Sequence, residues 1–188
     1  GTKYIVGHAD AMLGTVSTTK ESWHELLNCT GFLGQCSGPD DLYLAQRGFR
    51  TLSVRLRQHQ TSALKLAEWL QNRQEVNQVL YPALEGAPGH KIWKRDFLGA
   101  SGLFAIELKP FSEAAVENML NGMRLFGMGY SWGGYESLLI PANVQKSRTV
   151  LPWLFKGPLL RIHIGLEDAD DLKDDLNEGL KRLRNYKG

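Results

Sequence analysis

Residues 39–72 read PDDLYLAQRGFRTLSVRLRQHQTSALKLAEWLQN. Pro39 follows Gly38 and precedes two acids, a combination that is typical of a helix start. Apolar residues then recur mostly at steps of three or four as far as Leu70, and only Gly48 interrupts them. The pattern predicts either one helix of about 34 residues, ~50 Å long, or two helices joined near Gly48. Because ~50 Å exceeds the diameter of a small domain, we expect this segment to link two bodies.

The sequence changes character on either side of the helical segment. Upstream, residues 11–18 (AMLGTVST) are short, apolar and rich in Val and Thr, which predicts a strand, and Thr18 or Thr19 would then cap a helix. Downstream, alternation and helix-start residues predict strands and helices in turn. The predicted strands are residues 76–82, 101–109, 136–141 and 158–167, a further strand begins near residue 124, and the predicted helices lie within residues 87–97, 112–123 and 168–183. The second half therefore reads as helices packed on one sheet, in the α/β class.

Composition excludes several classes of function. With 188 residues and 43% hydrophobic residues, the chain can bury a core, as one compact unit or as one domain plus part of another. The net charge of +2 is nearly balanced, and without a Lys/Arg run or an apolar stretch of roughly 20 residues we expect no nucleic-acid or membrane partner. Cys29 and Cys36 are too few for a zinc site, and two free thiols in a reducing cytosol, hence a cytoplasmic location, are expected rather than a small disulfide loop.

Three features carry candidate chemistry. Lys3 is either a solvated lysine or an amine that attacks a carbonyl group, and spacing alone does not choose between them. Arg161 lies in the apolar run LLRIHIGLED, where it either faces solvent or forms a fork that binds a carboxylate. Residues 129–137 (GYSWGGYES) form either a turn with one buried Trp or a loop that lines a substrate site, because glycines let the backbone approach a ligand closely.

The histidines and acids indicate no metal centre. His163 shares a strand face with Arg161 and is predicted to be a satisfied structural histidine. The remaining histidines show no metal-binding or triad spacing and are predicted to be structural or at the surface; they are His8, His24, His59 and His90. The acids at the start of the last helix are predicted to be solvated; they are Asp168, Asp170, Asp171, Asp174 and Asp175.

Six sequence blocks occur in a recognisable order from residue 2 to about residue 184. They read TKYIVGHAD, SGPDDLYLAQRGFRTLSVRLRQH, YPALEGAPGH, SGLFAIELK, YSWGGYESL and RIHIGLED. Together they resemble the pyridoxal-phosphate enzymes of cysteine and methionine metabolism, the trans-sulfuration group. Six ordered blocks are more specific than any single motif. One departure is Ala9, where this family commonly has Ser.

The resemblance implies the cofactor pyridoxal 5′-phosphate and a role for five residues. Lys3 would bind the aldehyde of the cofactor and serve as the catalytic base, and Thr2 would bind its phosphate. Arg161 would pair with the α-carboxylate of the substrate, and Ser131 and Trp132 would belong to the loop that closes around it. Trp132 makes the resemblance strongest to members that cleave at Cβ. The implied reaction is β-elimination at a carbon–sulfur bond of cystathionine or a related cysteine conjugate, which gives homocysteine, pyruvate and ammonia.

The same resemblance implies the PLP-dependent transferase-like fold (fold type I), of which only the second half is expected here. Residues 1–48 would be the tail of the large cofactor-binding domain, and residues 49–188 the small C-terminal α/β domain with the linking helix. The phosphate loop and the residues that hold the cofactor ring would precede residue 1, so the isolated chain is expected to be inactive. A homotetramer, built as a dimer of dimers with shared sites, is also implied. The alternatives are a γ-synthase or γ-lyase, and a non-enzymatic assembly domain.

Overall fold

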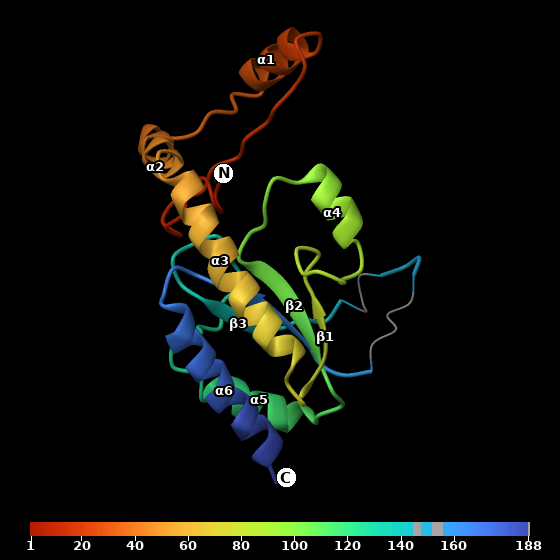
Figure 1. The fold of residues 1–188 in the computed structure, drawn as a ribbon. Helices are drawn as coiled ribbons and strands as arrows, with labels where there is room; N and C mark the ends of the chain where they lie inside the picture. The colour runs from red at the N-terminus through yellow and green to blue at the C-terminus, as the bar shows by residue number, and fades with distance from the viewer. Residues whose placement is uncertain (145–147, 152–155, 188) are drawn as a thin grey trace.

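The computed structural model describes residues 1–144, 148–151 and 156–187, and within these ranges six helices accompany one four-stranded sheet (Figure 1). In chain order the elements are α1 (Trp23–Phe32), α2 (Pro39–Phe49), α3 (Leu52–Gln71), β1 (Val76–Leu80), α4 (His90–Asp96), β2 (Leu103–Leu108), α5 (Glu113–Asn121), β3 (Leu138–Pro141), β4 (Leu159–His163) and α6 (Ala169–Asn185). The predicted α/β class is confirmed. Each pair of neighbouring strands is antiparallel.

The sheet separates a packed face from a face that is open to the candidate site. Its strand order is β1-β2-β4-β3, so β2 and β4 are the central strands. On β4, Leu160 and Ile162 are fully buried within the core that helices α3, α5 and α6 complete (Figure 1). Because side chains alternate along a strand, Arg161 and His163 point to the opposite face. The alternation that the sequence shows thus determines which side of the sheet carries polar groups.

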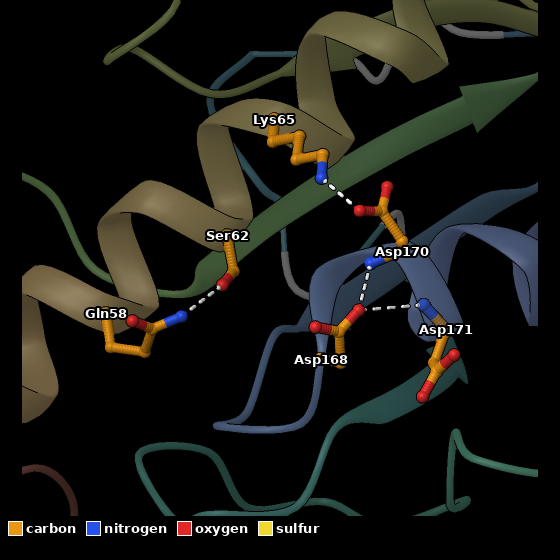
Figure 2. Close-up of polar contacts among 6 residues, drawn as sticks. All are labelled: Gln58, Ser62, Lys65, Asp168, Asp170 and Asp171. Atoms are coloured by element: carbon orange, nitrogen blue, oxygen red, sulfur yellow. Dashed lines mark hydrogen bonds and ion pairs between the residues drawn. The ribbon is translucent and has the colours of Figure 1, made fainter.

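Helix α6 is held on the packed face by leucines and at its start by a cap. The buried leucines recur at helical spacing and are each at most 2% exposed; they are Leu172, Leu176, Leu180 and Leu183. Each contributes about 2 kcal/mol by removing its side chain from water. Figure 2 shows the cap, in which the Asp168 carboxylate accepts hydrogen bonds from the backbone N–H groups of Asp170 and Asp171. The same view shows Lys65 of α3 paired with Asp170 at 2.8 Å, which joins the two helices at the surface.

The helical segment of residues 39–72 consists of two helices, which is the second of the two predicted alternatives. Helix α2 ends at Phe49, and α3 begins at Leu52 with Thr51 as its N-cap. Gly48 lies just before this break, and glycine fits there because a side chain would collide with the carbonyl oxygen of Val6. Helix α3 then crosses the sheet and packs against it (Figure 1). The division into units 1–48 and 49–188 stays a prediction.

The predictions for residues 11–22 are wrong. Residues 11–18 are not a strand: they pair with no strand in the described part of the chain, and Met12 and Val16 are exposed. Helix α1 begins at Trp23 with Ser22 at its N-cap, so neither Thr18 nor Thr19 caps it. The helix buries none of its residues and stands away from the sheet (Figure 1). A high content of Val and Thr does not by itself form a strand, because the backbone of a strand must hydrogen-bond to the edge of a neighbouring strand.

Two further predictions need correction in the second half. The strand expected near residue 124 does not form, and its only pairing in the described residues is a single bridge between Gly127 and Leu138. Asp175 is buried rather than solvated, with 1% of its surface exposed. Its carboxylate accepts hydrogen bonds of 2.8–3.4 Å from the backbone N–H groups of residues 124–126. The Asp175 carboxylate on α6 thus accepts the backbone hydrogen bonds that a neighbouring strand would otherwise have accepted.

Candidate active site

Lys3 lies in a tight turn that a buried arginine holds in place. The turn is closed by hydrogen bonds from Val6 N–H to the Gly1 carbonyl at 3.0 Å and from Gly7 N–H to the Lys3 carbonyl at 2.8 Å. Arg55 of α3 is only 6% exposed and donates to the carbonyl oxygen of Tyr4 at 2.8 Å. The same guanidinium also donates to the carbonyls of residues 5 and 48. The backbone around Lys3 is therefore fixed to the α2–α3 junction.

The glycine-rich loop of residues 129–137, called the substrate loop after the role that the resemblance implies, lies directly on this turn. Gly133 has a φ of +83°, and a Cβ there would lie 2.8 Å from both the Lys3 carbonyl carbon and the Tyr4 nitrogen. Such a close approach of two backbones requires glycine. Lys3 Nζ donates to Ser131 Oγ at 3.0 Å and lies over the Trp132 ring, 4.4 Å from its centroid. Residues 128 positions apart in the sequence thus meet.

Arg161 reaches the same loop from the sheet. It lies on central strand β4, between Ala105 of β2 and Ile140 of β3. Its Nη2 atom donates to the backbone carbonyls of residues 129, 130 and 131 at 3.3, 2.7 and 3.2 Å. Its guanidinium carbon lies 5.5 Å from the centroid of the Trp132 ring. Trp132 therefore contacts both Lys3 and Arg161, and the loop joins the two cations in one constellation.

The geometry leaves donors available for an anion. Within the described residues every side-chain hydrogen bond of Arg161 comes from Nη2, so Nε and Nη1 remain for a carboxylate. A groove of about 930 Å³ opens beside Arg161, with Tyr130, Ile140 and Lys156 also among its lining residues. Lys3 and Trp132 are not part of that lining. The groove is therefore lined by Arg161 but not by the lysine.

Thr2 has a partner other than the expected one. Its Oγ1 accepts a hydrogen bond from the backbone N–H of Leu13 at 2.9 Å, and its backbone N–H donates to the Leu13 carbonyl at 3.1 Å. Thr2 thereby ties the extended residues after the turn to the start of the chain. Its predicted contact with a phosphate stays a prediction, and it would require the hydroxyl to be shared with Leu13.

Several residues that support the loop escaped the sequence prediction. Ser137 ends the loop, and its N–H and hydroxyl donate to the Glu167 carboxylate at 2.7 and 2.8 Å. Gly133 N–H lies 3.1 Å from Nε2 of His163. The prediction that His163 is a satisfied structural histidine is wrong at Nδ1, which has no hydrogen-bond partner among the described residues. The signal available in the sequence was the spacing RIH, which places two polar residues on one face of an otherwise apolar strand.

Burial sets the ionisation of the histidines behind the loop. The pKa of His163 is lowered from its usual 6.5 to about 4, chiefly by burial; the hydrogen bond to the Gly134 carbonyl opposes this shift, and the nearby His59 and Arg161 add to it. Burial also lowers the pKa of His59, against the opposing effect of its hydrogen bond to the Ile164 carbonyl. Both imidazoles are thus neutral at physiological pH.

Other kinds of site find no support in the part of the chain that the structure describes. There, no three side chains among His, Cys, Asp and Glu are grouped so that they could hold a metal ion. None of the helices described is long and apolar enough to cross a membrane. Cys29 and Cys36 are exposed, and both are free thiols.

Comparison with known proteins identifies the family to which the chain is similar. The family of Cys/Met metabolism PLP-dependent enzymes matches residues 1–181. Cystathionine beta-lyase of Salmonella typhimurium is 48% identical over 187 residues, which are 97% of this chain and 47% of that protein. Cystathionine beta-lyase of Escherichia coli strain K12 is 47% identical over 186 residues, with the same shares. The crystal structure of cystathionine gamma synthase from Xanthomonas oryzae matches with a TM-score of 0.85 and 36% identity, over 97% of this chain and 49% of that one.

The family match over residues 1–181 places the chain in the class of pyridoxal-phosphate enzymes. The chain belongs to the family of PLP-dependent enzymes of cysteine and methionine metabolism. It spans about half the length of the curated relatives that it matches. The residues present fit the cofactor, because Lys3 has a half-buried amine that contacts a hydroxyl and, among the described residues, pairs with no carboxylate. Such an amine is available to bind an aldehyde.

Proposed function

We propose that the chain forms the C-terminal half of a carbon–sulfur lyase that carries out β-elimination on cystathionine or a related cysteine conjugate. The products would be homocysteine, pyruvate and ammonia. The observation that carries the proposal is the meeting of Lys3, Trp132 and Arg161, which come from three distant parts of the sequence. The similarity to two cystathionine beta-lyases supports the choice of reaction.

Each residue of the constellation has a task in this proposal. When bound, pyridoxal phosphate supplies an electron-accepting ring that stabilises negative charge at Cα of an amino acid. Lys3 Nζ would hold the cofactor through its aldehyde, and as a free amine it would take the proton from Cα of the substrate. Ser131 Oγ accepts a hydrogen bond from Lys3 Nζ at 3.0 Å and thereby orients the amine. The free edge of Arg161 binds the α-carboxylate and fixes which bond of Cα faces Lys3.

The role of Arg161 is tested by Arg161→Lys in the enzyme that includes the preceding half. A lysine keeps the charge but has no planar fork, so we expect kcat/KM to fall at least about tenfold, mainly through KM. Unchanged kcat/KM would contradict the assignment. Lys65→Arg on the exposed face of α3 serves as the matched control, because it changes a cation of the same kind that lies outside the site.

The reaction itself is distinguished by product analysis. Cystathionine cleaved at Cβ yields pyruvate with homocysteine, whereas cleavage at the γ-carbon yields 2-oxobutyrate with cysteine. We expect the first pair. The second pair would favour the alternative of a γ-type enzyme, for which the similarity to the Xanthomonas gamma synthase is the supporting observation.

A non-enzymatic assembly domain is the remaining alternative, and covalent trapping separates it from an enzyme. Pyridoxal phosphate is added, borohydride reduces the linkage, and mass spectrometry locates the added group. We expect modification of Lys3 when the preceding half is present, and only weak modification of the isolated chain, because Thr2 is the only phosphate-binding residue that the resemblance assigns to it. Equal labelling of exposed lysines would favour the assembly domain.

The proposal includes a cytoplasmic homotetramer, a dimer of dimers with sites shared between subunits. Its support is the apolar surface of the region around α1 and α2, which the described chain leaves uncovered. The exposed residues there are Met12, Val16, Trp23, Leu27, Phe32, Leu33, Leu42, Tyr43 and Phe49. Exposed large apolar side chains gathered in one region of the chain are typical of interfaces. Light scattering of the complete enzyme tests the assembly, and a monomer at micromolar concentration would contradict it.

A further inference from the structure

A cluster of three aromatic rings lies directly behind the lysine turn. Tyr4, His59 and His163 contact one another with ring centroids 5.4, 6.0 and 5.3 Å apart. His59 and His163 are 0% and 1% exposed. Nε2 of His59 and Nδ1 of His163 have no hydrogen-bond partner among the described residues. Buried polar atoms without partners are costly, so their presence beside a functional turn calls for an explanation.

His163 contacts the glycine turn of the substrate loop through a single atom. Its Nε2 lies 3.1 Å from the Gly133 nitrogen and 3.2 Å from the Gly134 carbonyl oxygen. With the proton on Nδ1, the ring accepts from Gly133 N–H; with the proton on Nε2, it donates to Gly134. Either tautomer ties the ring to this turn. Only a neutral ring can accept, and its burial keeps it neutral.

The Gly133 turn controls the place of Ser131 relative to Lys3. Gly133 packs on the Lys3 backbone so closely that a Cβ would lie 3.0 Å from the Lys3 Cβ. Ser131, two residues earlier, contacts the Lys3 amine. Upstream of this point, Arg161 holds the loop carbonyls of residues 129–131. Two residues of β4 therefore hold the loop, one on each side of Trp132.

We propose that His163 is a positioning residue for the substrate loop. Its imidazole holds the Gly133 turn and thereby places Ser131 and Trp132 against Lys3. The tyrosine and His59 behind it complete the packing around the ring. That His163 holds the loop is a statement about this chain alone. The expected effect on turnover of the amino-acid substrate rests on the proposed function. If His163 only filled volume, an apolar side chain of similar size could replace it. The experiment therefore compares an apolar with a polar substitution at this position.

The first measurement is amide hydrogen exchange of Gly133 by NMR in the chain as it stands, without cofactor. His163→Leu removes the polar atom and keeps much of the volume, whereas His163→Gln keeps an amide that can reach the turn. Losing a hydrogen bond of about 1 kcal/mol corresponds to exchange about fivefold faster. We expect this increase at Gly133 in the Leu variant and recovery in the Gln variant, with amides of α6 unchanged. If the Leu variant does not fold, His163→Asn, polar but shorter, takes its place with the same expectation.

Equal exchange at Gly133 in all variants would overturn the inference and leave the proposed function standing. The second measurement is kinetic, in the enzyme with its preceding half. We expect His163→Leu to lower kcat/KM for the amino-acid substrate at least about fivefold and His163→Gln to restore most of it. Kinetics unaltered by the Leu variant would overturn the positioning role. Failure of borohydride to fix the cofactor on Lys3 in the unaltered enzyme would instead overturn the proposed function, while the exchange result would still report on the loop.

Discussion

Gly133→Ala is the substitution that most directly tests the contact between the substrate loop and the lysine turn. At φ +83°, alanine costs about 1–2 kcal/mol through backbone strain alone. Its Cβ would also lie 2.8 Å from the Lys3 carbonyl carbon and 3.0 Å from the Lys3 Cβ, well inside the 3.5–4.0 Å of an ordinary carbon–carbon contact. Overpacking of this kind adds about 1–3 kcal/mol.

Gly89→Ala is the matched control for this substitution. Gly89 has the same φ of +83°, but a Cβ there meets no atom within 4 Å, so it shows the strain without the collision. We expect Gly133→Ala to lower the free energy of unfolding by about 2 kcal/mol more than the control does, which corresponds to about 4–8 °C in Tm for a chain of this size. Thermal unfolding followed by circular dichroism measures the difference. Equal losses of Tm in the two variants, with equal amide exchange in residues 131–134, would refute the argued contact.

Three further predictions concern buried and exposed charges. Asp175→Ala should lower the free energy of unfolding by about 3 kcal/mol, because backbone N–H groups of residues 124–126 lose their acceptor; a loss below about 1 kcal/mol in urea denaturation would contradict this. The folded-state pKa of His163 is about 4, below the usual 6.5, so the unfolded chain binds its proton first, and stability should fall by about 3 kcal/mol as pH drops from 6.5 to 4. The urea midpoint of His163→Gln should show a shallower pH dependence in that window, since it keeps only what His59 and the carboxyl groups of lowered pKa, such as Glu178, contribute with the same sign. An identical slope would speak against the assignment. Asp170→Asn removes an exposed pair with Lys65 and should leave Tm unchanged, so a clear loss would show that this surface pair matters more than exposed pairs usually do.

The sequence by itself determined the elements whose signals are local. Gly38-Pro39 started α2, Ser112 capped α5 with its hydroxyl on Ala115 N–H, and Asp168 capped α6, each through hydrogen bonds or dihedral preferences within four residues. The alternation LLRIHI placed Arg161 and His163 on one face of β4. Residues 11–18 failed because strand formation depends on a partner that their own composition does not supply.

Only the tertiary structure decided how these pieces meet. Lys3, Ser131 and Arg161 are far apart in the chain, and the contact among them depends on a glycine turn, on Arg55 beneath the lysine and on the register of β4 with its neighbours. Asp175 looked like one more solvated acid until the fold placed backbone N–H groups around it. The physical reason is the same in each case: a side chain's burial and partners are set by segments distant in sequence, and its hydration or pKa follows from them.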